Sequence, residues 1–170
     1  SCLNQTYKNI EVIVVDDGST DNTKEIVKSI HDNRLKYYGY KKNKGACYAR
    51  NDGINQSTGE YIAFNDSDDI YLTNKIEEQI NNMKKTKSDM DFSIVRMVLD
   101  KNNTIHFPNE SHIKSINNGN YIDQLVKGNF ISMITILVKK SVITKYMFDE
   151  EIPRWQDYDL VLRMIPDIKV

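Results

Sequence analysis

The sequence Tyr-Ile-Ala-Phe-Asn-Asp-Ser-Asp-Asp-Ile-Tyr, residues 61–71, contains a short strand pattern that ends in three carboxylates. Its first four residues are apolar or aromatic, as in a strand buried within a sheet. The acids that follow are Asp66, Asp68 and Asp69. Carboxylates this close together repel one another, so they need a cation or hydrogen-bond donors as partners. The stretch therefore predicts a buried strand with a divalent metal site at its carboxyl end.

A second strand that ends in acids lies near the start of the chain. Residues 12–15 are all Val or Ile, which fits a strand covered on both faces. They lead into Asp16 and Asp17, and then into a turn with Gly18 and Ser19. A helix is expected after the turn, because Ser or Thr can cap it and apolar residues then recur at helical spacing. This order of strand, turn and helix is the first half of a βαβ unit.

Strands and helices alternate through the first half of the chain, which predicts an α/β fold with a mostly parallel sheet flanked by helices. Ligands of such sheets bind beyond the carboxyl ends of the strands, where both acidic turns would lie. After residue 91 the pattern is less regular and indicates a smaller mixed region. Further expected strands are residues 35–40, 92–99, 104–107 and 134–138. Expected helices are residues 46–55, 121–126 and 140–146, one that Thr73 caps and one that starts within residues 155–159. Residues 100–103 are expected to form a hairpin turn, and residues 108–119 a loop.

The composition is that of a globular protein, since 39% of the 170 residues are hydrophobic and 28% are charged. The net charge of -1 gives no electrostatic reason to expect nucleic acid as a partner. Two cysteines are too few for a disulfide framework, no apolar run approaches the ~20 residues that span a bilayer, and no signal pattern begins the chain. We therefore expect one cytoplasmic domain. Because the chain starts without methionine, we also expect a piece of a longer protein, so that membrane association would rest on segments outside it.

Four motifs follow one another along the chain. They are Val-Val-Asp-Asp-Gly-Ser-Thr-Asp at 14–21, Asn-Lys-Gly at 43–45 with Ala-Arg-Asn at 49–51, Gly-Glu-Tyr-Ile-Ala-Phe-Asn-Asp-Ser-Asp-Asp at 59–69, and Phe-Asp-Glu-Glu at 148–151 with Gln-Asp-Tyr-Asp at 156–159. Together they resemble the large family of GT-A-fold glycosyltransferases, of the family 2 type, that use nucleotide-sugar donors and invert the anomeric centre. The resemblance implies a Rossmann-like sheet in a single catalytic domain, residues 1–170. Residues 1–91 would bind the nucleotide sugar and residues 92–170 the acceptor.

The resemblance also implies how the donor is held. Asp16, Asp17 and Ser19 would contact the nucleotide, with Asp17 accepting the N–H of a uracil-like ring, because a carboxylate offers acceptors only. Lys44 and Arg50 would meet the diphosphate. The alternatives are that these acids form a solvated turn at a helix amino terminus and that both cations are solvated surface charges.

The block at 59–69 resembles the metal-binding Asp-x-Asp element of the same family. A Mg²⁺ or Mn²⁺ ion there would neutralise the charge that develops on the leaving diphosphate. Asp66 and Asp68 would contact the donor, and Asp68 or Asp69 would hold the ion. Which acid ligates the ion stays open, and the alternative is an acidic loop that caps the helix after Thr73.

Asp157 matches the catalytic base of the family, which takes the proton of the attacking acceptor hydroxyl. The preceding residue is Gln156, where the family often has Glu, so the charge next to the base differs. Trp155 and Tyr158 would stack on an acceptor sugar. The alternatives are an acid at a helix amino terminus for Asp157 and packing under the last helix for the two aromatic residues.

The sequence thus predicts a metal-dependent inverting glycosyltransferase that moves a sugar from a UDP-linked donor to a hydroxyl of a saccharide or lipid-linked acceptor. Its expected setting is bacterial cell-surface polysaccharide synthesis at the inner face of the membrane. Two alternatives stay open. Family members begin with a further strand that touches the nucleotide base and would precede Ser1, so the chain would then be a donor-binding fragment without catalysis. A sugar-phosphate nucleotidyltransferase shares the architecture, but it needs a Gly-rich basic phosphate loop that the sequence lacks.

Overall fold

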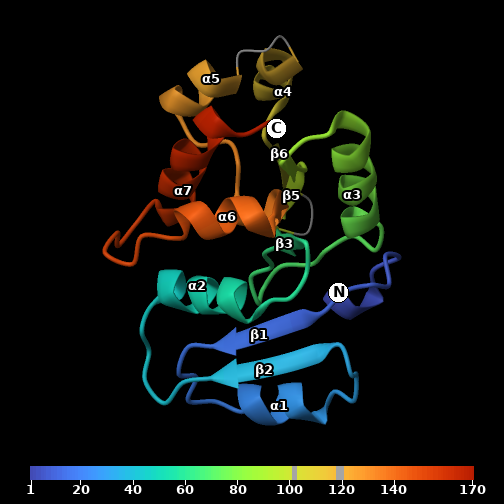
Figure 1. Ribbon diagram of the computed structural model, residues 1–170, viewed down its shortest axis with the longest axis vertical. Helices are drawn as coiled ribbons and strands as arrows, with labels where there is room; N and C mark the ends of the chain where they lie inside the picture. The colour runs from blue at the N-terminus through green and yellow to red at the C-terminus, as the bar shows by residue number, and fades with distance from the viewer. Residues whose placement is uncertain (101–102, 118–120) are drawn as a thin grey trace.

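Two parallel strands with a helix between them form the first part of the fold. The computed structural model describes residues 1–100, 103–117 and 121–170. β1 (Val12–Asp16) pairs with β2 (Leu35–Gly39), α1 (Thr23–Ser29) connects them, and α2 (Ala46–Gln56) packs on β1. In Figure 1, α2 lies between this strand pair and α6 (Lys140–Tyr146). The first acidic turn begins at Asp16, the last residue of β1, and so lies at the carboxyl end of this strand, as the sequence predicts.

A three-stranded ladder forms the second part of the fold. β7 (Ile136–Lys139) lies between β3 (Tyr61–Ala63) and β4 (Met90–Phe92) and is antiparallel to both. β3 and β4 therefore run in the same direction, with α3 (Lys75–Thr86) between them in the chain. The α/β fold class predicted from the sequence is confirmed. The antiparallel direction of β7 was not predicted, because a hairpin and two helices, and not a single crossover helix, separate β4 from β7 in the chain.

A hairpin and several helices complete the chain. β5 (Val95–Val98) and β6 (Thr104–Phe107) pair in antiparallel fashion, and Figure 1 places them with α4 (Glu110–Asn117) and α5 (Tyr121–Lys127) at the end of the molecule away from β1 and β2. α7 (Gln156–Met164) is the last α-helix. Short 3₁₀ helices span Cys2–Asn4, Met133–Thr135 and Ile165–Asp167. Within the described parts of the chain, no helix is both long enough and apolar enough to cross a membrane.

Two predictions for this second half were wrong. The strand expected at residues 92–99 is interrupted, since β4 ends at Phe92 and β5 begins at Val95. The loop expected at residues 108–119 contains α4, whose first turn is capped by the side chain of Asn109. The Asn109 Oδ1 atom accepts hydrogen bonds from the backbone N–H groups of Ser111 and His112, at 3.1 Å each. In the expected hairpin turn, Asn103 donates to the Asp100 carboxylate, while residues 101–102 lie outside the described part of the chain.

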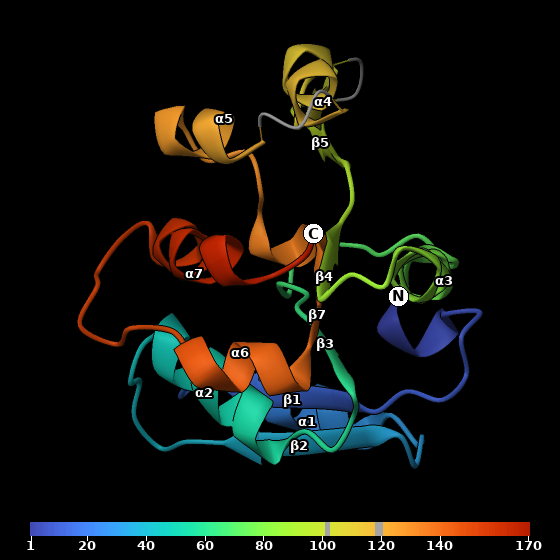
Figure 2. The same cartoon turned by 45° about the horizontal axis from the view of Figure 1, so that its top comes forward.

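The core lies on both faces of β7. Ile136 and Val138 face one cluster, which includes residues of α6 and α7, and Leu137 faces a second cluster built on α3. This division follows from the alternation of side chains along a strand. Figure 2 shows α6 and α7 on one side of the ladder and α3 on the other. Because all three side chains are at most 2% exposed, β7 is the most enclosed strand of the ladder.

Glu11 fastens the start of β1 to the turn before β3. One carboxylate oxygen accepts hydrogen bonds from the backbone N–H of Thr58, the Thr58 hydroxyl at 2.9 Å and the Gly59 N–H at 3.1 Å. The other oxygen pairs with Lys36 Nζ at 2.6 Å. Burial alone raises the pKa of Glu11, but the hydrogen bonds from Lys36 and Thr58 outweigh it and lower the pKa to about 2.

We expect Glu11→Gln to lower the free energy of unfolding by about 1–3 kcal/mol at pH 7, because it weakens charge-assisted hydrogen bonds. A carboxylate with a lowered pKa stabilises the fold fully above its unfolded pKa, 4.5 for Glu, and loses this contribution as pH falls toward 2. Urea unfolding of both proteins at pH 7 and pH 3.5 measures the effect. The difference should be smaller at pH 3.5, and an equal difference at both pH values would contradict the prediction.

Candidate active site

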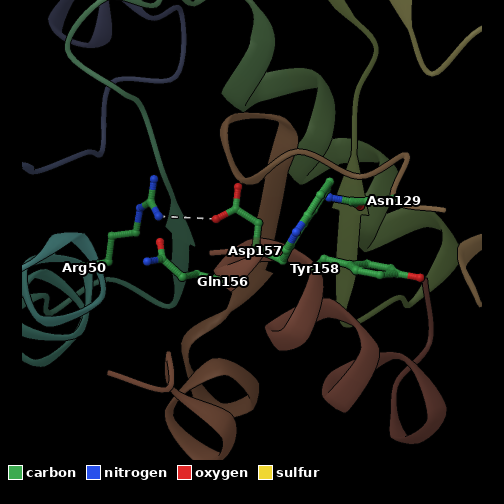
Figure 3. A pocket seen from close by; sticks show the side chains of 6 residues that line it. Arg50, Asn129, Gln156, Asp157 and Tyr158 are labelled. Carbon is green, nitrogen blue, oxygen red and sulfur yellow. Dashed lines mark hydrogen bonds and ion pairs between the residues drawn. The ribbon is translucent and has the colours of Figure 1, made fainter. Parts of the chain in front are cut away.

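A pocket of about 290 Å³ lies at the amino-terminal end of α7. Figure 3 shows that its walls come from α2, from the segment after α5, and from the first residues of α7. Its lining residues are Arg50, Asn129, Trp155, Gln156, Asp157 and Tyr158. The predicted base and both predicted acceptor-binding residues therefore share one pocket with a residue predicted to bind the donor.

Arg50 connects this pocket to the acidic loop after β3. Its Nη1 atom lies 3.3 Å from Asp157 Oδ1, the contact drawn in Figure 3, and its Nη2 atom lies 3.2 Å from Asp66 Oδ1. The guanidinium carbon also lies 5.5 Å from the centre of the Phe148 ring, and the Arg50 side chain is 20% exposed. One cation thus joins the two acidic regions that the sequence analysis assigned to donor and acceptor chemistry.

Asp157 is the second residue of α7, so it lies in the positive field of the helix amino terminus, as the alternative interpretation also requires. Its Oδ2 atom accepts a hydrogen bond from the Met133 N–H at 3.4 Å. The neighbouring Gln156 donates to the carbonyl oxygen of Ile152 at 3.2 Å. The Gln156 side chain therefore stabilises the loop that leads into α7, and as a neutral amide it places no charge next to Asp157.

The two aromatic residues differ in their surroundings. Trp155 is 74% exposed and has a left-handed backbone conformation, with φ of 62°. It stands at the rim of the pocket and is not packed under α7. Tyr158 instead donates its hydroxyl proton to the carbonyl oxygen of Leu125 at 2.6 Å, which ties the start of α7 to α5. The geometry thus favours the packing role for Tyr158 and leaves the Trp155 ring available to a ligand.

The acidic loop after β3 has a defined shape. Asn65 donates its side-chain N–H groups to the carbonyl oxygens of Asp66 and Asp69, at 3.0 and 3.3 Å, and the Tyr71 hydroxyl donates to the carbonyl oxygen of Phe64. Burial, followed by the charges of Asp68 and Asp66, raises the pKa of Asp69. The Asn65 Oδ1 atom is buried and has no hydrogen-bond partner within the described residues. The carboxylates of this loop thus offer closely spaced ligand atoms, all of which are oxygen.

These ligands fit a hard divalent cation, which prefers oxygen donors. Within residues 1–100, 103–117 and 121–170, however, no group of three or more His, Cys, Asp or Glu side chains is arranged to hold a metal ion by itself. An ion bound through Asp68 or Asp69 would therefore need further oxygen atoms from a ligand. Mg²⁺ and Mn²⁺ in phosphate sites often take most of their ligands from phosphate and water.

The first acidic turn packs against the basic loop at residues 41–45. Asp17 accepts hydrogen bonds from the backbone N–H groups of Lys44 and Gly45, at 2.8 Å each, and so fixes the two segments together. The approach is close at Gly18, which has a φ of 83° and where a Cβ atom would lie 2.8 Å from the backbone nitrogen of Asn43. Because a carboxylate has about four acceptor positions, Asp17 retains capacity for a further donor.

Asp16 and Lys44 have protein partners of their own. Asp16 is 7% exposed and accepts hydrogen bonds from the Ser19 N–H at 2.8 Å and the Tyr37 hydroxyl at 2.5 Å. The Ser19 side chain, followed by the Tyr37 hydroxyl, lowers the pKa of Asp16. These contacts give Asp16 a structural role within the turn, although its carboxylate is buried and not solvated as the alternative interpretation states. The Lys44 ammonium lies 4.1 Å from the centre of the Tyr48 ring and donates to the Tyr48 hydroxyl at 2.9 Å. The Tyr48 side chain therefore holds the Lys44 ammonium in place.

Comparison with known proteins shows the family to which the chain belongs. The family model described as glycosyl transferase family 2 matches residues 1–143, well over half of the chain. The chain belongs to glycosyl transferase family 2. It is therefore a glycosyltransferase domain.

Several proteins align with nearly the whole of this chain. A Haemophilus influenzae protein named as an uncharacterized glycosyltransferase is 34% identical over 99% of this chain and 65% of its own length. The Escherichia coli protein WfgD, named as a UDP-Glc:alpha-D-GlcNAc-diphosphoundecaprenol beta-1,3-glucosyltransferase, is 34% identical over 98% of this chain and 62% of its own length. The crystal structure of S. aureus TarS 1-349 matches 98% of this chain and 50% of that one, with a TM-score of 0.79 and 23% identity, and confirms the GT-A-like fold. The chain thus spans less than two thirds of each of these relatives.

The glycosyltransferase domain also contains two site residues that the sequence analysis did not assign. Asn129 lines the pocket, and Asn51, 8% exposed, holds the segment that leads to α7. Asn51 accepts from the Phe148 N–H at 2.8 Å and donates to the Phe148 carbonyl oxygen and to Glu150 Oε1, at 2.9 Å each. The only signal in the sequence for Asn51 was its place beside Arg50 in a family motif, and no local pattern indicated Asn129.

We expect Asn51→Ala to lower the free energy of unfolding by about 2–3 kcal/mol, because it leaves the buried Phe148 N–H and carbonyl groups without partners. Urea unfolding measures the change. Asn55→Ala is the matched control, since Asn55 lies on the same helix with an exposed side chain, and it should change stability by less than about 0.5 kcal/mol. Equal effects of the two substitutions would contradict the anchoring role of Asn51.

Proposed function

We propose that this domain transfers a sugar, with inversion, from a UDP-sugar to a hydroxyl group of a saccharide or lipid-linked acceptor. The observation that carries the proposal is the double contact of Arg50, which links Asp66 in the acidic loop to the carboxylate of Asp157 in the pocket. A transferase of this class needs a group for the donor diphosphate and a base for the acceptor within reach of one anomeric carbon.

On the donor side, the free acceptor capacity of Asp17 would receive the N–H of the uracil ring. Asp68 and Asp69, with Asp66 beside them, would hold a Mg²⁺ or Mn²⁺ ion together with the diphosphate. When bound, the ion supplies charge neutralisation for the leaving diphosphate. Arg50 would add a forked pair of donors to the same phosphate oxygens.

On the acceptor side, Asp157 would remove the proton from the attacking hydroxyl. The acceptor oxygen then forms a bond to the anomeric carbon while the bond from that carbon to the phosphate oxygen breaks, and the electron pair stays with the diphosphate. Attack opposite to the leaving group inverts the anomeric centre. The exposed Trp155 ring at the pocket rim would stack on the acceptor sugar.

The relatives suggest a first acceptor to test. WfgD and a second Escherichia coli relative, WfaP, are both named as glucosyltransferases that act on GlcNAc-diphosphoundecaprenol. We propose that residues 1–91 bind the donor and residues 92–170 an acceptor of this lipid-linked class, at the inner face of the membrane in cell-surface polysaccharide synthesis. Membrane association would rest on segments outside this chain.

Calorimetric titration with UDP, in the presence and absence of Mn²⁺, tests the donor assignment. We expect UDP to bind and Mn²⁺ to tighten the binding at least tenfold, and ADP and GDP to bind more weakly. Transfer from UDP-glucose to a GlcNAc-diphospholipid then separates an enzyme from a donor-binding domain without catalysis. Binding without transfer would favour the second function, and the lack of any heat with UDP and Mn²⁺ would refute both.

A further inference from the structure

The guanidinium of Arg50 is shared between two carboxylates, and neither contact is the paired, bidentate kind. Each carboxylate uses one oxygen and one Arg50 nitrogen, at 3.3 Å for Asp157 and 3.2 Å for Asp66. We propose that Arg50 leaves Asp157 for the donor diphosphate, so that donor binding frees the base. This inference rests on the proposed function of the domain.

Both carboxylate oxygens of Asp157 contact other parts of the protein. Oδ1 pairs with Arg50, and Oδ2 accepts the weak hydrogen bond from the Met133 N–H at 3.4 Å. A carboxylate oxygen that already faces a guanidinium offers less of its lone pair to a hydroxyl proton. Moving Arg50 away is therefore the simplest step that exposes an acceptor atom of Asp157 to the incoming hydroxyl.

The donor is a stronger partner for Arg50 than Asp157 is. A diphosphate carries more negative charge than one carboxylate, and its oxygen atoms match the fork of the guanidinium in a bidentate way. Arg50 already contacts Asp66, which lies in the loop proposed to hold the donor diphosphate. Its backbone is fixed in α2, and the buried Phe148 ring supports the guanidinium, so a rotation about the outer side-chain bonds is enough to exchange partners.

This exchange has a thermodynamic consequence that can be measured without turnover. If binding of the sugar donor breaks the Arg50–Asp157 ion pair, donor binding and formation of this ion pair oppose each other. This coupling is reciprocal. Removing the Asp157 carboxylate then removes the competitor for Arg50 and should strengthen UDP binding. A substitution that only disturbed the structure would weaken binding.

Calorimetry with UDP and Mn²⁺ on four proteins tests this directly: the natural chain, Asp157→Asn, Arg50→Gln and the double variant. We expect Asp157→Asn to lower the UDP dissociation constant about threefold, the size expected for a partly exposed ion pair. Arg50→Gln should raise the constant, and Asp157→Asn should change nothing further when Arg50 is absent. Glu151→Gln, which removes an exposed carboxylate from the same loop, is the control for general charge effects and should leave the constant unchanged.

Two results would overturn the inference. The first is an unchanged or weaker UDP affinity in Asp157→Asn. The second is an equal gain with and without Arg50, which would indicate simple repulsion between Asp157 and the ligand. If UDP does not bind the natural chain at all, the proposed function fails as well. Arginine side-chain NMR on the natural chain is an independent check, in which the Arg50 signal, identified by its loss in Arg50→Lys, should shift on UDP addition.

Discussion

Asp157→Asn should reduce the rate of sugar transfer by about 10²- to 10⁴-fold, the contribution expected from a general base. The amide has the same shape as the carboxylate but cannot take the hydroxyl proton. UDP should still bind, because Asp157 lies on the acceptor side of Arg50. Initial rates of transfer from labelled UDP-glucose to a GlcNAc-diphospholipid measure the effect.

The matched control for this prediction is Asp159→Asn. Asp159 lies two residues further along α7, and its carboxylate pairs with Arg163 at 2.7 Å, away from the pocket lining. Its substitution should change the transfer rate by no more than a few fold. If Asp157→Asn keeps most of the transfer rate, another group is the base and the mechanism proposed above is wrong.

Asp69→Asn should abolish the enhancement of UDP binding by Mn²⁺ and lower the transfer rate on the order of 100-fold or more, because a metal ion contributes several kcal/mol to the stabilisation of the leaving diphosphate. Asp69 is singled out because burial and the charges of Asp68 and Asp66 raise its pKa, a sign of uncompensated negative charge. Calorimetry with UDP, with Mn²⁺ and with EDTA, measures the loss.

Glu77→Gln is the control for the metal prediction. Glu77 is an exposed carboxylate in the first turn of α3, shortly after the acidic loop. Its removal should leave the Mn²⁺ effect intact, which separates a specific ligand from the general charge of this region. If Asp69→Asn retains the full Mn²⁺ effect, Asp69 is not a ligand and Asp68 becomes the residue to test.

Local patterns in the sequence were sufficient for much of the fold. The apolar run at residues 12–15 forms a strand, and so does the later part of the run predicted at residues 134–138, while its first two residues belong to a 3₁₀ helix. The acids that follow β1 and β3 lie at strand ends, because an apolar strand and a polar turn each have a strong local signature. The prediction that these two strands are buried was wrong, since most residues of β1 and β3 are partly exposed and β3 is an outer strand of its sheet. The helix at residues 110–117 was missed because its cap, Asn109, follows Pro108 in a polar stretch that also reads as a loop.

The arrangement of the site depends on contacts that no local pattern contains. Arg50 and Asp157 are separated by 107 positions, and Asn51 and Phe148 by 97. The sequence indicated each of the first two as a charged site residue, but not that they contact each other. Such pairs follow only from the way α2 and the segment before α7 pack together, which is a property of the whole fold.

The central place of β7 also constrains how the protein can be made. On the ribosome, β3 and β4 emerge long before the strand that hydrogen-bonds to both of them. Until residues 136–139 leave the exit tunnel, neither strand has its partner, so both edges of each strand are open to pairing with other chains. A chain that terminates before Ile136 should therefore be prone to aggregation, because β3 and β4 lack the strand that joins them.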